Sequence, residues 1–260
     1  MPDLNQRCVI TVPADLDGGT VMDFYSKLDS LIEERPVEIL LDCSDLEHTT
    51  SSHISTLWQA RQRCQRAGIP VRLSSVRYGL FRILKILNLY ELFEFEQGTV
   101  ESKPGMEKAR LGAESVPALR LDFLPSAWAI KDALDRFHDY LRELNVQEIC
   151  AFDLETVFYE ITTNIRLHGQ LDDDDCIGFV ATPCGDVISL RFIDPGPMFD
   201  PTSDPPHFDP DQAIRRRQTS GFGLTMIRRL VDSISYHRRD DGRNVVTLTK
   251  KLSRKWRMGL

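Results

Sequence analysis

The chain has 260 residues, enough for one large domain or two of ordinary size. Its 42% hydrophobic and 27% charged residues fit a protein that folds around real cores. The formal net charge of −7 argues against a general nucleic-acid binder, which normally has a broad basic surface. No apolar run approaches the roughly 20 residues that cross a bilayer, and the N-terminus lacks a secretion-signal pattern, so we expect a cytoplasmic protein.

The first half of the chain alternates between strand-like and helix-like segments. Short apolar or alternating runs predict the strands, and apolar residues at helical spacing predict the helices between them. In chain order we expect a strand at 8–14, a helix at 20–34, a strand at 37–42, a helix at 53–67, a strand at 71–73, a helix at 80–87 and an apolar segment at 92–95. Such alternation predicts an α/β sheet covered by helices.

The apolar pattern stops between the two halves. The segment 96–117 contains glycines, prolines and mixed charges without a sustained period, which is typical of a linker. We therefore expect one domain at 1–97, a linker at 98–117 and a second domain at 118–260.

The second half has a different order of elements. We expect a strand at 119–123, helices at 128–144 and 154–168, a hairpin of strands at 177–182 and 187–192, a helix at 224–232 and a last strand at 245–250. A long loop rich in proline and aspartate follows the hairpin.

Three short motifs in this half could carry chemistry. Glu160 and Asn164 are four residues apart, so a helix places them on one face; water could equally satisfy both. Asp194, with Gly196, ends an apolar strand and could either meet a ligand or simply form a turn. Gly221-x-Gly223 precedes a helix, where free amides suit phosphate, but such short glycine motifs are common.

The order of these motifs, closed by Thr247 in the last strand, resembles the GHKL ATPase family over residues 119–252. The strings IDPGPMFDP, SGFGLTMIRRLVDSISY and DGRNVVTLTKKL are similar to those of RsbW-type serine kinases, which act as anti-sigma factors. The resemblance implies a Bergerat-type α/β sandwich with a mixed sheet, and ATP and Mg²⁺ as cofactors.

The resemblance also implies a role for each matched residue. Asn164 would offer its amide oxygen to Mg²⁺, and Glu160 would orient or deprotonate the attacking hydroxyl. The other matched residues would bind the nucleotide: Asp194 the adenine amino group with Thr247 in support, Gly196 the adenine ring, and Gly221 and Gly223 the phosphates.

In the first half, the string LLDCSDLEHTTSSHISTLWQA resembles the centre of STAS domains, the anti-sigma factor antagonists. The likeness runs from about residue 8 to 95, and its serine pair makes Ser52 the candidate phosphoacceptor. Thr50 and His53 depart from the aspartate and glycine of the family pattern. A cluster of hydroxyl residues could alternatively be a simple helix cap.

Together, the two resemblances predict a partner-switching regulator. It would be an ATP-dependent protein serine kinase and anti-sigma factor fused to a STAS antagonist domain, controlling transcription by phosphorylating a STAS serine or sequestering a sigma factor. Expected partners are its own or a separate STAS domain, a sigma factor and a second copy in a homodimer, without nucleic acid or membrane. Two alternatives stay open: a non-catalytic, nucleotide-responsive interaction module, and an ATPase whose only output is hydrolysis.

Overall fold

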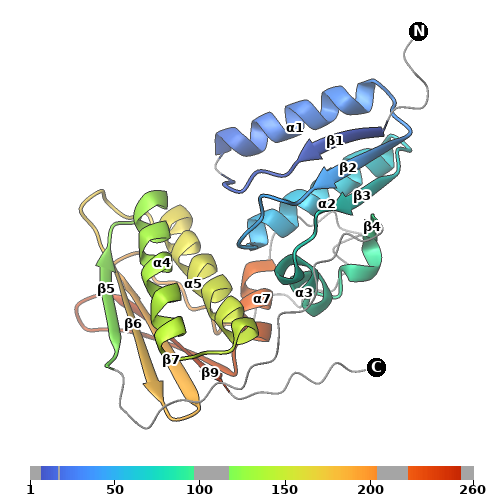
Figure 1. Cartoon of the computed structure of the whole chain (residues 1–260). Helices are drawn as coiled ribbons and strands as arrows, with labels where there is room; N and C mark the ends of the chain where they lie inside the picture. The colour runs from blue at the N-terminus through green and yellow to red at the C-terminus, as the bar shows by residue number, and fades with distance from the viewer. Residues whose placement is uncertain (1–6, 17, 97–116, 204–221, 253–260) are drawn as a thin grey trace. The chain divides into compact units, whose positions relative to one another are not determined.

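The computed structural model describes residues 7–16, 18–96, 117–203 and 222–252. The chain divides into two compact units, Met1–Lys103 with Pro206–Met226 and Pro104–Pro205 with Ile227–Leu260 (Figure 1). Within the described ranges, no helix combines the length and the apolar character needed to span a bilayer.

The first unit contains a four-stranded parallel sheet in the order β1-β2-β3-β4. Its strands are β1 (Arg7–Thr11), β2 (Glu38–Asp42), β3 (Val71–Ser74) and β4 (Glu94–Phe95). The connecting helices are α1 (Gly18–Glu33), α2 (Ser51–Arg66), α3 (Tyr78–Ile86) and the short 3-10 helix η1 (Tyr90–Leu92). Each strand is therefore joined to its parallel neighbour by a helical crossover, as the alternating sequence pattern predicted.

The second unit contains a five-stranded sheet in the order β5-β6-β7-β9-β8. Its strands are β5 (Leu119–Phe123), β6 (Ile177–Cys184), β7 (Val187–Asp194), β8 (Ser233–Arg238) and β9 (Asn244–Lys251). Every pairing among them is antiparallel, so the prediction of a mixed sheet was wrong. Short loops join β6 to β7 and β8 to β9. Between β5 and β6, two consecutive helices return the chain to the end of the sheet at which β5 ends.

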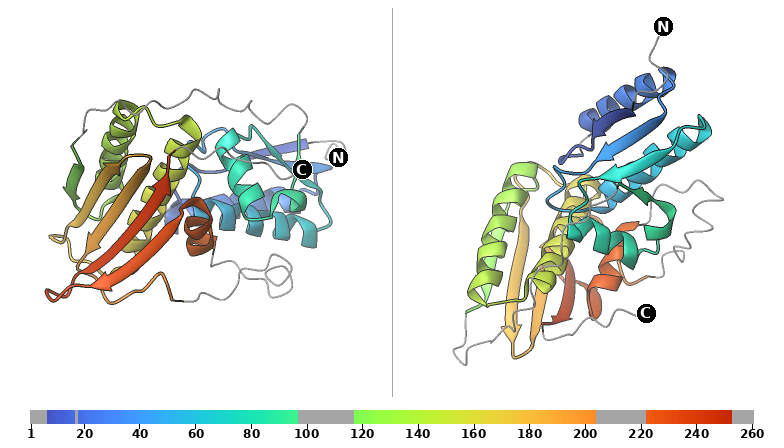
Figure 2. Two further views of the ribbon diagram at one scale, coloured as in Figure 1. Left: turned by 90° about the horizontal axis from the view of Figure 1, so that it is seen from below. Right: turned by 45° about the vertical axis from the view of Figure 1, so that its right-hand side comes forward.

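That pair of helices, α4 (Ala127–Glu143) and α5 (Glu148–His168), covers one face of the five-stranded sheet (Figure 2). Four buried aromatic rings fill the layer between: Phe137, Phe158, Phe179 and Phe192. The ring centres of Phe158 and Phe179 lie 4.8 Å apart, and those of Phe158 and Phe192 lie 5.9 Å apart. These contacts fix α5 against the central strands β6 and β7.

The predicted helices and strands are confirmed in type and order, but three elements were not predicted as such: the 3-10 helix η1, strand β4, which was expected only as an apolar segment, and strand β8. Strand β8 was missed because its sequence, SISYHR, is polar and lies at the edge of the sheet, where few side chains are buried. The remaining helix of this region, α7 (Phe222–Leu230), precedes it.

Candidate functional site

The pair Glu160 and Asn164 occupies one face of α5, as its spacing predicted. Glu160 is only 2% exposed, and Asn164 is half-buried. The Asn164 side-chain nitrogen donates to Glu160 Oε1 over 3.3 Å. Its amide oxygen has no hydrogen-bond partner among the described residues, and an uncommitted oxygen suits a hard cation.

The turn after β7 holds the second motif. Asp194 is 7% exposed, and its Oδ1 accepts a hydrogen bond of 2.9 Å from the backbone N–H of Gly196. A Cβ atom at position 196 would lie 2.7 Å from the carbonyl oxygen of Gly169, which caps α5. Glycine is therefore required at position 196 because the turn approaches the end of α5 too closely for a side chain.

Two contact points show that α5 runs alongside β7 in the same direction. Phe158 meets Phe192 at one point, and Gly169 meets the turn at Gly196 at the other. Glu160 and Asn164 lie between these points on α5, as Asp194 does on β7. The two motifs, separate in sequence, therefore lie toward the same end of α5 and β7.

Asn244, at the start of β9, is the residue that sequence reasoning missed. It is 3% exposed and pairs directly across the sheet with Asp194. Its side-chain nitrogen donates to Asp194 Oδ1 over 2.9 Å and to the carbonyl oxygens of Gly196 and Pro197 over 3.2 and 2.9 Å. One amide therefore holds both the carboxylate and the turn that follows it.

The expectation that Thr247 supports Asp194 is corrected by the register of β9. Thr247 lies opposite Arg191 on one side and Ser235 on the other. Because side chains alternate between the faces of a sheet, Thr247 points to the face opposite that of Asp194 and Asn244. The signal that could have located Asn244 was the Asp-Gly turn just before it, which sets where β9 begins.

Two residues of β8 hold Asn244 in turn. The Tyr236 hydroxyl and the Arg238 guanidinium both donate to the Asn244 amide oxygen, each over 2.9 Å. Arg238 also reaches the Gly196 carbonyl oxygen over 3.3 Å. The missed strand β8 therefore contributes directly to the site.

Burial raises the pKa of the Asp194 carboxyl above its ordinary value. The hydrogen bonds from Asn244 and Gly196 and the charge of Arg238 oppose that rise without cancelling it. The site thus keeps a desolvated carboxyl group, which forms stronger hydrogen bonds with a ligand than a hydrated one.

The predicted acceptor region of the first unit begins at the end of β2. The Ser44 hydroxyl donates to Asp42 Oδ2 over 3.0 Å, and the Ser44 N–H donates to Oδ1 over 3.2 Å. Ser52 is the second residue of α2 and is half-buried. Its hydroxyl therefore lies in the first turn of a helix, where backbone amides favour an anion.

Thr50 and His53 form a capping box at the start of α2. The Thr50 N–H donates to His53 Nδ1 over 3.1 Å, and the His53 N–H donates to Thr50 Oγ1 over 3.3 Å. Since Nδ1 accepts, the ring proton sits on Nε2, which donates to the Ala14 carbonyl oxygen over 2.9 Å. The alternative interpretation of this cluster as a helix cap is confirmed for Thr50.

His53 is 3% exposed, and burial lowers the pKa of its imidazole. The neutral ring is the form that can accept from Thr50 and donate to Ala14 at the same time. The two departures from the STAS pattern are therefore partners of one another.

Comparison with protein-family models identifies both units. Residues 2–102 match the STAS domain, and residues 125–250 match the histidine kinase-like ATPase domain. The chain carries a STAS domain followed by a histidine kinase-like ATPase domain. An ATPase domain of this kind implies nucleotide binding, and Glu160, Asn164 and Asp194 lie within its matched range.

Solved structures offer more distant similarity. The RsbU and RsbW domains of a Mycobacterium tuberculosis protein are 21% identical over 56% of this chain, with a TM-score of 0.40; this chain covers 35% of that one. The SiaB–SiaC complex of Pseudomonas aeruginosa is 17% identical over 51% of this chain and 88% of its own, with a TM-score of 0.35. No curated protein matches the sequence.

Of the two glycines predicted to bind phosphate, only one lies among the described residues. Gly223 is the second residue of α7, and Gly221 lies outside the described residues, so their role in phosphate binding stays a prediction.

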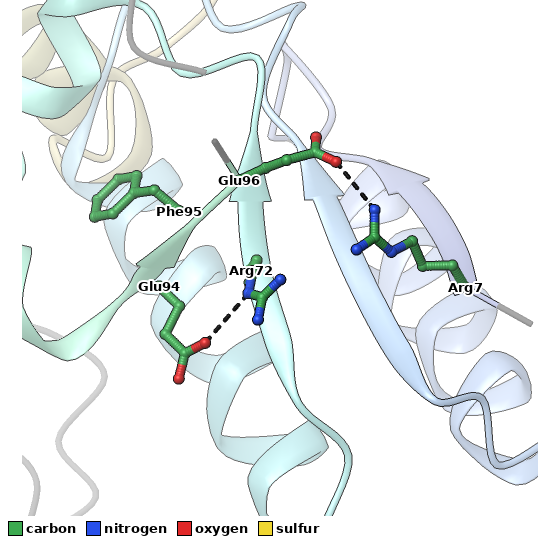
Figure 3. A pocket seen from close by; sticks show the side chains of 5 residues that line it. All are labelled: Arg7, Arg72, Glu94, Phe95 and Glu96. Carbon is green, nitrogen blue, oxygen red and sulfur yellow. Dashed lines mark hydrogen bonds and ion pairs between the residues drawn. The ribbon is translucent and has the colours of Figure 1, made fainter. Parts of the chain in front are cut away.

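The STAS domain also has a pocket of about 610 Å³, shown in Figure 3, that is lined by residues of β1, β3 and β4 and by Glu96 just after β4. Its lining residues are Arg7, Arg72, Glu94, Phe95 and Glu96. Arg7 pairs with Glu96 and Arg72 with Glu94, each over 3.2 Å, and both arginines also contact the buried Glu38. The charges are paired across the strands, which is typical of an ion-pair ladder that stabilises the sheet.

Proposed function

We propose that this protein is a Mg·ATP-dependent protein serine kinase joined to a STAS antagonist domain, acting as a partner-switching regulator of transcription. The observation that supports it best is that Glu160 and Asn164 on α5 lie toward the same end of the helix and strand as Asp194 on β7. A buried acid, an amide with a free oxygen and a desolvated carboxyl group are the groups that such a reaction needs.

In this proposal each group has one task. Asp194 accepts a hydrogen bond from the adenine amino group, and Gly221 and Gly223 bind phosphate through backbone amides. The uncommitted amide oxygen of Asn164 holds Mg²⁺, which neutralises charge on the phosphates when bound. Glu160 orients the acceptor hydroxyl and takes its proton as the phosphoryl group is transferred.

The proposed acceptor is Ser52 of the STAS domain, in the same chain or another. A phosphoserine in the first turn of α2 adds roughly −2 charge and three acceptor oxygens. Such a charge would change which protein the STAS domain binds. A sigma factor would then compete with the STAS domain for the ATPase domain, and fusion would keep the two domains at a local concentration on the order of millimolar.

Intact-mass measurement of the full chain with Mg·ATP tests the proposal. The wild type and a separate STAS protein should be offered together, and at least one should gain a phosphoryl group. Glu160→Gln keeps the size and the hydrogen bond to Asn164, so it should bind ATP normally and transfer nothing. Absence of any increment on either protein, despite ATP binding, would contradict the kinase.

A second candidate function is a non-catalytic, nucleotide-responsive interaction module. The closed Thr50–His53 box favours it, because this box differs from the acceptor pattern of STAS domains. ATP binding without transfer or phosphate release would support the module. Release of inorganic phosphate without protein phosphorylation would instead support an ATPase.

A further inference from the structure

The two oxygens of the Asp194 carboxylate are in different environments. Oδ1 accepts from the N–H of Gly196 and from the Asn244 amide, each over 2.9 Å. Oδ2 has no hydrogen-bond partner in the described part of the chain, although the residue is 7% exposed. Rotation of the carboxylate would break both bonds at Oδ1, so Oδ2 is held as the oxygen that can accept from a ligand.

Asn244 is the side chain that fixes this arrangement. Its nitrogen reaches three acceptors, namely Asp194 Oδ1 and the carbonyl oxygens of Gly196 and Pro197. Two N–H groups thus link the carboxylate to the backbone of its own turn. Asn244 is 3% exposed, so these bonds are largely shielded from water.

The orientation of the Asn244 amide is set from β8. Tyr236 and Arg238 both donate to its oxygen, and a guanidinium has no acceptor with which to bind a nitrogen donor. If the amide turned over, its oxygen would face the Asp194 carboxylate and its nitrogen would face Arg238. Both contacts would be repulsive, so β8 keeps the N–H side toward Asp194.

We propose that Asn244, oriented by Tyr236 and Arg238, is the residue that sets base selectivity by holding Asp194 Oδ2 toward the nucleotide. An exocyclic amino group donates to Oδ2, whereas a base with an oxygen at the same position meets the carboxylate with a second acceptor. Asn244 is a positioning residue, because it acts through Asp194. The inference rests on the proposed binding of ATP by this site.

Comparing ATP with ITP isolates this contact, since ITP carries an oxo group in place of the amino group. Dissociation constants for both nucleotides with Mg²⁺ are measured on the full chain. A site built around one hydrogen bond should prefer ATP by about 100-fold or more. Asn244→Leu should reduce that ratio by at least about 10-fold, mainly because ATP binds more weakly while ITP changes little.

A milder variant guards against misfolding of Asn244→Leu. Tyr236→Phe removes one hydroxyl that contacts neither Asp194 nor the turn, and it should lower the ratio by a smaller factor. Ser235→Ala is the matched control. Ser235 is next to Tyr236 in the chain, but its side chain lies on the opposite face of the sheet, the face of Thr247. Its ratio should equal that of the wild type.

Three results would overturn the inference. Unchanged affinities for both ATP and ITP in Asn244→Leu and Tyr236→Phe would show that Asp194 needs no support from Asn244. An equal loss of affinity for ATP and ITP would show that Asn244 is only structural. A wild type that binds neither nucleotide would refute the proposed function itself, which separates that failure from the first two.

Discussion

The turn at Asp194 in the ATPase domain and the loop at Thr50 in the STAS domain use the same kind of buried polar network with opposite results. In the first, Asn244 satisfies Asp194 Oδ1 and leaves Oδ2 without a partner among the described residues. In the second, Thr50 and His53 satisfy one another, and the remaining ring nitrogen donates to the Ala14 carbonyl oxygen. The first network is open to a ligand, and the second is closed on itself.

The difference indicates which polar group of each region is left to contact a ligand or a partner. In the ATPase domain this group, the Asp194 carboxylate, belongs to the network itself. In the STAS domain it lies beside the network, at Ser52, because Thr50 and His53 are each 3% exposed and already paired. Breaking the open network should therefore affect binding, whereas breaking the closed one should affect stability.

The largest expected effect is on the open network. Asp194→Asn replaces the accepting oxygen by a donor, so ATP affinity should fall by about 100-fold or more in a titration with Mg·ATP. Because burial raises the pKa of Asp194, its ionised form costs stability near neutral pH, and the neutral amide should raise the Tm of the nucleotide-free protein. Retained ATP affinity would refute the role given to Asp194.

The closed network should respond in the opposite way. His53→Ala leaves the Thr50 N–H and the Ala14 carbonyl without their partner and opens a cavity beside α2, so the STAS domain should lose about 2–4 kcal/mol of stability. Urea unfolding and hydrogen exchange of the α2 amides measure this loss. ATP affinity, measured in parallel, should stay at the wild-type value; an unchanged stability would mean that the box contributes nothing.

A smaller effect is expected from pH, with opposite signs in the two regions. The pKa of His53 is lowered from 6.5, so the unfolded chain binds the proton more readily, and STAS stability should fall as pH drops below about 6.5. The pKa of Asp194 is raised from 3.8, so its cost to the ATPase domain grows as pH rises through the raised value. ATP affinity should fall in acid, because a protonated Asp194 no longer accepts from the adenine amino group.

His53→Gln separates the first of these terms from the others. It should flatten the pH dependence of α2 hydrogen exchange between about pH 5 and 7, since it removes the titrating ring. The acid loss of ATP affinity should persist in this variant. A pH dependence of exchange that survives the substitution would show that His53 is not its source.

The parts of the molecule that follow from local pattern could be predicted from the sequence. Helical spacing located Glu160 and Asn164, and the end of an apolar strand located Asp194 and Gly196. Thr247 was chosen over Asn244 because the register of β9 decides which side chains share a face with Asp194, and a shift of one residue reverses that answer. The sequence pattern does not fix this register.

The capping box illustrates a second limit. Thr50 and His53 are close in sequence, but the contact that completes the box joins His53 to Ala14, 39 residues away. Strand β8 was missed for a related reason, since its polar residues look like a loop until β9 pairs with them. In both cases a contact between residues far apart in the sequence determined the structure, and residue spacing could not predict that contact.

Peptide mapping of the full chain after incubation with Mg·ATP would locate the transferred phosphoryl group and so test the proposed kinase activity and its acceptor together. We predict one phosphorylated residue in the α2 peptide, at Ser52, and its loss in both Ser52→Ala and Glu160→Gln. Modification of Thr50 instead, or of Ser52 in the Glu160→Gln protein, would contradict the roles assigned to the closed network and to the proposed base.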